Sequence, residues 1–204
     1  MRWIVFVLCL LVPANTLALT LEGKDYEASI TVAGRQLKLI GAGLREVYGF
    51  NVYTLGAYSE DGDCEEKNIV ESEQVKYLRL DILRNIDAEK VARRIAEAFA
   101  ENMPQDASMT LQKQRDQSFS YFNGRCLKGT VFEFIYIPGK GTIFKQNGKA
   151  IGPIIPGKDY HTVFWNVYFG PNTCCSDLKD QLLVECMPEP EATPYDPLGD
   201  VYRF

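Results

Sequence analysis

The chain has 204 residues, of which 46% are hydrophobic and 12% aromatic, and its formal net charge at pH 7 is −5. These values are typical of a globular protein and exclude a disordered chain. A mildly acidic protein has no broad electrostatic attraction for DNA, RNA or anionic lipid, so no nucleic-acid partner is expected.

The amino-terminal segment predicts export. Arg2 places a positive charge near the amino terminus, and residues 3–12 form an apolar run. Thr16-Leu17-Ala18 then places small residues at the two positions that a signal peptidase recognises. This pattern predicts a signal peptide over residues 1–18, cleaved near Ala18, and hence a periplasmic or secreted protein. A membrane span needs roughly 20 apolar residues, so this run is too short, and no other segment is expected to cross a bilayer.

The next part of the chain predicts strands and helices in a mixed order. Alternating apolar and polar residues, or many β-branched and aromatic residues, predict strands over 26–32, 36–47, 50–58, 75–83 and 130–137. The Asn147-Gly148 turn predicts a hairpin of 141–146 with 149–151. Apolar stripes and capping residues predict helices over 88–102, 111–122, 158–169 and 176–184. Strand pairs followed by helices, a hairpin and further helices indicate an α+β fold with a largely antiparallel sheet.

The carboxy-terminal composition separates a domain from a tail. Residues 19–186 are long enough for one domain with a sizeable core. Residues 187–204 contain four prolines among acidic residues, a composition that does not form a packed core. We therefore expect a Pro-rich flexible tail.

Five cysteines follow the predicted cleavage site. In an oxidising compartment they are disulfide candidates: Cys64, Cys126, Cys174, Cys175 and Cys186. Up to two disulfides can form, with one thiol left over, and the pairing stays open. The adjacent pair is expected to bond to two different partners, because a ring closed between neighbours is strained. Zinc is the competing interpretation, but without a CxxC pair or clustered histidines no metal site is predicted.

One strand segment carries an arginine on a face that begins apolar. On a regular strand, positions 37, 39, 41, 43 and 45 share a face, which reads Leu, Leu, Gly, Gly, Arg. Gly41 and Gly43 remove side chains beside Arg45 and leave space for another group to approach closely. This pattern predicts a pocket that contains one positive charge.

The turn after this segment decides which residue lies beside Arg45. If Tyr48-Gly49-Phe50 is a three-residue loop, Arg45 lies opposite Tyr53, with Cβ atoms roughly 5 Å apart. A two-residue loop would pair Arg45 with Val52 instead. A guanidinium fork matches a carboxylate, and a tyrosine hydroxyl adds a further donor.

The competing interpretations of these residues are structural. An arginine on a strand commonly pairs with a nearby acid, here Glu46 or Asp81. The lone histidine, His161, lies at the start of a predicted helix and is expected to have a surface or capping role. With one histidine, no Ser-His-Asp or Cys-His triad is recognisable, and no cofactor motif is present.

Several motifs resemble the chalcone-isomerase family, in particular its exported bacterial branch, in the same order along the chain. They are Gly41-Ala42-Gly43-Leu44-Arg45, residues 52–58, residues 78–80 with the Asp87 helix, residues 134–142 and residues 155–160. The resemblance covers about residues 25 to 185. It implies an open-faced sandwich, in which helices cover one side of a large antiparallel sheet and a ligand cleft lies between them.

The resemblance also implies which residues form the site. In that family, plant enzymes close a chalcone into a flavanone with an arginine, a threonine, a tyrosine and an asparagine, whereas plastid members bind fatty acids through the arginine and a tyrosine. Arg45 matches the arginine, and Tyr53 matches the fatty-acid binders' tyrosine. The enzymes' other polar positions fall near Ala88, Ile95 and Val167, which cannot hydrogen-bond a ketone.

The resemblance therefore implies a non-catalytic protein that binds a fatty acid or similar small apolar carboxylate without a cofactor. Arg45 and Tyr53 would hold the head group beside Gly41 and Gly43. Two alternatives remain open. One is an intramolecular lyase (isomerase) of chalcone-isomerase type, with Arg45 as its catalytic residue, and the other is a structural or partner-binding module.

Overall fold

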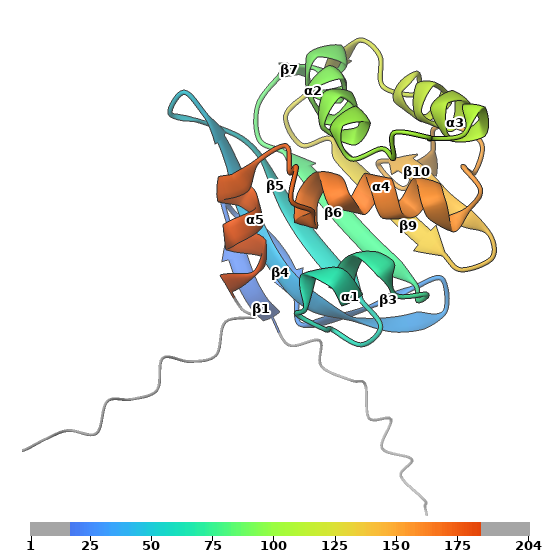
Figure 1. The fold of residues 1–204 in the computed structure, drawn as a ribbon. Coiled ribbons are helices and arrows are strands. Elements are labelled where there is room, and N and C mark those ends of the chain that lie inside the picture. Colours follow the sequence, from blue (N-terminus) through green and yellow to red (C-terminus); the bar gives the residue numbers. More distant parts are fainter. Residues whose placement is uncertain (1–16, 185–204) are drawn as a thin grey trace, which may run out of the picture.

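The structure, a computed structural model, describes residues 17–184. Seven strands form one antiparallel sheet in the order β11-β10-β9-β6-β5-β4-β3, and helices cover one of its faces (Figure 1). The predicted α+β fold, a large antiparallel sheet covered by helices, is confirmed. The predicted signal peptide, apart from Leu17 and Ala18, and the predicted tail lie outside the described residues.

The strands agree with the prediction in all the longer segments. The large sheet contains β3 (Ser29–Val32), β4 (Arg35–Val47), β5 (Phe50–Ser59), β6 (Lys76–Ile82), β9 (Val131–Ile137), β10 (Gly141–Gln146) and β11 (Lys149–Ala150). Two short pairs add β1 (Leu17–Leu21) with β2 (Lys24–Glu27), and β7 (Ile86–Asp87) with β8 (Arg125–Cys126). The strand predicted over 26–32 is divided between β2 and β3. β1 was not predicted, and cleavage after Ala18 would remove its first two residues.

The described residues form five helices. They are α1 (Glu66–Glu71), α2 (Ala88–Glu101), α3 (Met109–Phe119), α4 (Lys158–Phe169) and α5 (Ser176–Leu182). The Asp87 side chain accepts hydrogen bonds from the amides of Glu89 and Lys90, as its predicted capping role requires. α1 was not predicted, because six residues are too few to show a helical period. Among the described residues, no helix is long and apolar enough to cross a membrane.

Alternation along the strands divides the apolar side chains between the two faces of the sheet. Toward the helices, Leu55 and Phe134 belong to the main core together with Trp165 of α4. On the opposite face, Tyr58 belongs to a second cluster with Tyr26 of β2. A side chain at Gly56 would overlap the Tyr26 ring, so that glycine lets the β1–β2 hairpin cover part of the outer face.

A β-bulge in β4 changes which residues face the helices. The register shifts between Leu39 and Gly41. As a result, Leu37 and Leu39 pack in the outer cluster, whereas Ile40 lies in the helix-side core. The prediction that positions 37 and 39 share a face with 41, 43 and 45 is therefore wrong, because one extra residue reverses the alternation.

His161 is buried and has neither a surface nor a capping role. Its side chain is fully buried, and its ring stacks on Tyr136 with 3.7 Å between the ring centroids. Burial lowers the pKa of His161 well below its usual range, and the charges of Lys76 and Lys158 lower it further. The imidazole is therefore neutral and belongs to the aromatic packing between α4 and the sheet.

Candidate functional site: a cationic cleft with two thiols

A two-residue turn and a bulge together place Arg45 opposite Tyr53. Tyr48 and Gly49 both have positive φ angles, 50° and 73°, and connect β4 to β5 directly. A second bulge, between Arg45 and Glu46, then shifts the register so that Arg45 pairs with Tyr53. The predicted pairing is present, but the predicted three-residue loop is wrong.

Arg45 and Tyr53 line a cleft of about 560 Å³ between this end of the hairpin and α2. The connection between α4 and α5 forms its third wall, through Cys174 and Cys175. Valine and isoleucine side chains make up most of the remaining lining: Val47, Val52, Ile86, Val91 and Ile95. The cleft thus has apolar walls and a small number of polar groups, as small-molecule sites generally do.

The charges that line the cleft are mainly positive. Arg45, Lys90 and Arg94 face it together with one acid, Asp87. Asp87 caps α2 and lies 4.0 Å from Lys90, and Arg94 pairs with Glu97 at 3.1 Å. Arg45 makes no hydrogen bond or ion pair with any residue in the range 17–184. Its guanidinium is therefore the group best placed to attract an anion.

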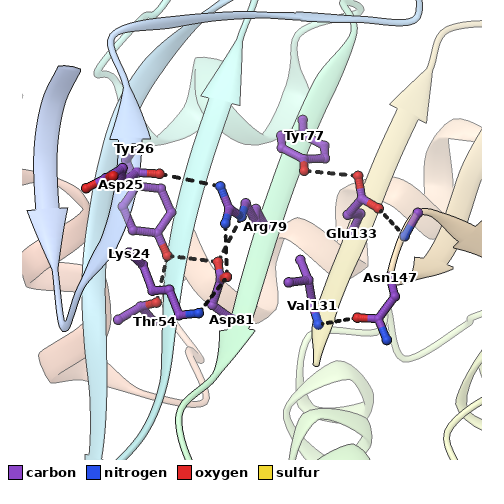
Figure 2. Close-up of polar contacts among 11 residues, drawn as sticks. Lys24, Asp25, Tyr26, Thr54, Tyr77, Arg79, Asp81, Val131, Glu133 and Asn147 are labelled. Atoms are coloured by element: carbon purple, nitrogen blue, oxygen red, sulfur yellow. Dashed lines mark hydrogen bonds and ion pairs between the residues drawn. The ribbon is translucent and has the colours of Figure 1, made fainter. Parts of the chain in front are cut away.

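The structural alternative for Arg45 required a nearby acid such as Asp81. Asp81 lies on the other face of the sheet, where its carboxylate accepts from Arg79 at 2.8 Å and from Tyr26 at 3.4 Å (Figure 2). Lys24 is a further cation, 3.8 Å from the same carboxylate. Asp81 is thus fully engaged away from the cleft.

The sequence predicts that Gly41 and Gly43 leave space for a ligand beside Arg45. This prediction is wrong, because α5 occupies that space. A side chain at Gly41 would overlap the carbonyl of Leu182, and a Cβ at Gly43 would lie 2.8 Å from Leu178. Both glycines therefore allow α5 to pack against β4, and neither lines the cleft.

Gln181 of α5 fixes this helix to the free edge of β4. Its side-chain oxygen accepts from the Leu44 amide at 2.8 Å, and its nitrogen donates to the Leu44 carbonyl at 3.1 Å. The side-chain amide thus pairs with a strand edge that β3 does not reach. Because α5 directly follows Cys175, this contact also holds the cysteine pair over Tyr53.

Two cysteines that the sequence predicts only as disulfide candidates line the cleft. Cys174 and Cys175 are 7% and 6% exposed, and their Sγ atoms lie 2.8 Å apart. The Tyr53 hydroxyl lies 3.9 Å from Cys175 Sγ. Their adjacency, directly before a predicted helix, is the one signal in the sequence that marks them.

The disulfide prediction is wrong for three of the five cysteines. Cys126, Cys174 and Cys175 carry free thiols. The adjacent pair does not bond to two different partners, because both of its thiols are free. Cys64 is not among the free thiols, and Cys186 lies outside the described residues.

The surroundings give the two thiols different acidities. A hydrogen bond from Cys174, with Arg45, Tyr53 and Arg94 nearby, lowers the pKa of Cys175 to about 7. The same hydrogen bond and burial raise the pKa of Cys174. Burial and the adjacent sulfurs raise the pKa of Tyr53 well above its usual value, so its phenol remains a donor.

A small apolar cavity adjoins the cleft beneath α2. Its volume is about 30 Å³, and it shares Ile86, Val91 and Ile95 with the cleft. Phenylalanines from α3 and the sheet, among them Phe119 and Phe132, complete its lining. The apolar surface therefore continues from the charged mouth into the core.

The sequence model of a family described as chalcone isomerase-like matches residues 18–184. The chain belongs to the chalcone isomerase-like family. Its structure is similar to the crystal structure of a fatty-acid binding protein of Arabidopsis thaliana, with a TM-score of 0.63 and 15% sequence identity. The similarity covers 79% of this chain and 92% of that one, and it shows a shared fold. No curated protein sequence matches the chain.

In this chalcone isomerase-like protein, the positions expected to carry the enzymes' further polar groups are apolar and buried. Ala88 and Ile95 are 5% and 9% exposed, and Val167 is fully buried in the helix-side core. None of the three offers a hydrogen bond. The polar groups near Arg45 are instead Tyr53 and the two thiols.

No metal site is visible in the part of the chain that the structure describes. Within it, no three His, Cys, Asp or Glu side chains lie together as metal ligands. The two thiols and three cations are therefore the chemically distinctive groups of this cleft.

Proposed function

We propose that this protein binds a fatty acid or a similar small apolar carboxylate in the cleft. One observation carries the proposal: Arg45 lines a cleft with apolar walls and has no hydrogen-bond or ion-pair partner between residues 17 and 184. A protein of similar fold is a fatty-acid binding protein, which supports an apolar ligand.

The head group would lie between β4, β5 and α2. The Arg45 guanidinium offers two parallel N–H donors to a carboxylate, and the protonated Tyr53 phenol offers a third donor. Lys90 and Arg94 add positive potential at the mouth, which speeds the approach of an anion.

The apolar tail would follow the apolar lining of the cleft. A volume of about 560 Å³ accommodates a small-molecule ligand. The adjoining cavity of about 30 Å³ holds little more than one water molecule, so a long tail can extend beneath α2 only if that helix moves outward. Short and medium chains therefore suit the cleft best.

The proposed role is binding without catalysis. Cyclisation of a chalcone requires donors that stabilise an enolate, each worth about 2–4 kcal/mol on the scale of oxyanion-hole deletions. Ala88, Ile95 and Val167 supply none. Carboxylate binding needs only the guanidinium fork, the phenol and an apolar lining.

The proposal also places the protein outside the cytoplasm. Arg2 and the apolar run over residues 3–12 support a signal peptide that is cleaved near Ala18. Expression of the full chain in a bacterial host, followed by mass measurement of the periplasmic protein, tests this. A protein that keeps residue 1 and stays in the cytoplasm would contradict export.

The test of binding is the substitution Arg45→Met, with displacement of a fluorescent fatty acid as the measurement. A hydrogen bond to a charged group contributes about 1.5–3 kcal/mol, so affinity should fall about 10- to 100-fold. Arg35→Met is the matched control, because Arg35 lies at the other end of β4 and pairs with Glu60 at 3.8 Å. Equal affinities of the wild-type and Arg45→Met proteins would end the proposal.

A further inference from the structure

The two adjacent thiols are more than neighbours in sequence, because the fold brings them together at the surface of the cleft. Their Sγ atoms lie 2.8 Å apart, and both side chains line the cleft. Cys126, the other free thiol of residues 17–184, lies on β8 and lines the apolar cavity beneath α2 instead. Within the described chain, Cys174 and Cys175 are therefore each other's reaction partners.

The groups around this pair favour a thiolate on Cys175. Arg45 and Arg94 contribute positive charge, and both the Cys174 thiol and the Tyr53 phenol are within reach of Cys175 Sγ, at 2.8 Å and 3.9 Å. In keeping with this arrangement, the pKa of Cys175 is lowered to about 7, whereas that of Cys174 is raised. Such a difference assigns Cys175 as the attacking sulfur and Cys174 as the resolving sulfur.

We propose that Cys174 and Cys175 form a redox-active dithiol that reduces anionic disulfides in this cleft. The thiolate of Cys175 attacks one sulfur of a disulfide RSSR, which forms a mixed disulfide and releases RS⁻. Cys174 then loses its proton and attacks Cys175 Sγ, which closes the Cys174–Cys175 bond and releases the second RS⁻. The cysteines lose two electrons and two protons, and RSSR becomes two molecules of RSH.

The charge of the cleft selects the substrate class. Arg45, Lys90 and Arg94 outnumber Asp87, so a disulfide that carries carboxylates is attracted and a cationic one is repelled. A disulfide between adjacent residues is strained and hence readily reduced again by an external thiol. The pair can therefore turn over with a thiol as the final reductant. This activity goes beyond carboxylate binding and does not require it.

The direct test uses the reduced wild-type protein and 5,5′-dithiobis(2-nitrobenzoate), an anionic disulfide. We expect the cleft to release two thionitrobenzoate ions and to retain no adduct. After trypsin digestion, the peptide of residues 159–179 contains Cys174 and Cys175 and no other cysteine. This peptide should be lighter by two hydrogens. Two free thiols, or a stable adduct on either cysteine of the wild-type protein, would overturn the proposal.

Single variants test the two roles separately. Cys174→Ser should still react through Cys175 but keep the mixed disulfide, whereas Cys175→Ser should react at least tenfold more slowly. Equal rates and equal adducts in the two variants would overturn the assignment. Cys126→Ser is the control, since that thiol lies outside the cleft. The wild-type peptide mass decides the proposal even where a variant does not fold.

A pair of reagents tests the substrate class. The wild-type protein should react about tenfold faster with the anionic reagent than with neutral 2,2′-dithiodipyridine, after correction for the intrinsic reactivity of each. Arg94→Met should reduce this preference, and Arg93→Met should not, because Arg93 lies on α2 but does not line the cleft. An identical preference in the two variants would overturn the role of the cleft charges.

Discussion

Two arginines on neighbouring parts of the same sheet have opposite surroundings. Arg79 of β6 lies on the outer face and pairs with the buried Asp81 at 2.8 Å, and Tyr26 also donates to that carboxylate (Figure 2). Arg45 of β4 faces the helices and lines the cleft, without a carboxylate partner in the described chain. The charge of Arg79 is therefore neutralised within the fold, whereas the charge of Arg45 is not.

This fold pairs the charge of Arg79 with a buried carboxylate and leaves the charge of Arg45 without one among the described residues. A buried carboxylate requires cations and donors around it, and Asp81 has Arg79, Lys24 and Tyr26. At the cleft, Lys90 pairs with Asp87 and Arg94 with Glu97, whereas Arg45 has no carboxylate partner among the described residues. A site that departs from local electrostatic balance is where a functional role is expected.

The largest expected effect is the loss of stability in Asp81→Ala. Asp81 is 1% exposed, and its removal leaves Arg79 without its carboxylate partner. Breaking a buried pair costs several kcal/mol, and because Arg79 is 33% exposed we expect a decrease of about 2–3 kcal/mol in the free energy of unfolding. Urea denaturation measures this decrease.

Asp106→Ala is the control for that substitution. Asp106 is exposed and should change the free energy of unfolding by no more than about 0.5 kcal/mol. Fatty-acid affinity of the folded Asp81→Ala protein should stay at the wild-type value, because the pair lies on the other face of the sheet. A large loss of affinity would show that the two faces of the sheet are coupled, and that Arg79 and Arg45 do not have separate roles.

The fold was predictable where the decisive signal is local. The helix predicted over 158–169 has those bounds in the structure, because its apolar spacing is helical and Gly157 and Gly170 flank it. The Asn147-Gly148 turn joins β10 to β11 as predicted, with positive φ at both residues. The family resemblance added the covering of one sheet face by helices.

The site was predictable only in part, because its remaining features depend on distant segments. The two bulges of β4 leave no mark in its alternation that distinguishes them from a regular strand. Gly41 and Gly43 allow close packing of a helix that begins more than a hundred residues later, so the sequence alone does not show that this helix occupies the space beside them. Likewise, Tyr53 and Cys175 are 122 positions apart in the chain and meet only in the folded protein.

A smaller effect is expected from pH on fatty-acid affinity. Because the pKa of Cys175 is lowered to about 7, its thiolate forms beside Arg45 as the pH rises and competes with the ligand's carboxylate. The ligand is ionised throughout this range. Affinity of the reduced protein should therefore fall about threefold to tenfold, roughly 1 kcal/mol, between pH 6 and pH 8.

Several other groups face Cys175, and the control must separate them from it. They are Arg45 on β4, Tyr53 on β5, Asp87 at the end of β7, Lys90 and Arg94 on α2, Tyr168 on α4, and the adjacent Cys174. Cys175→Ser retains all of them but removes the titrating thiol, so its affinity should be constant across the same range. A decrease of equal size in this variant would assign the pH dependence to another group.

The smallest expected effect is the change in the free energy of unfolding caused by Arg45→Met. Arg45 has no carboxylate partner in the described chain and shares the cleft with Lys90 and Arg94, so its removal breaks no pair and relieves like-charge repulsion. We expect Arg45→Met to leave the free energy of unfolding within about 0.5 kcal/mol of the wild type or to raise it slightly, below pH 7 where Cys175 is neutral. Urea denaturation at pH 6, beside Arg79→Met as the destabilised counterpart, measures both. If Arg45→Met lost as much stability as Arg79→Met, Arg45 would be a structural residue and its charge would not be available to a ligand.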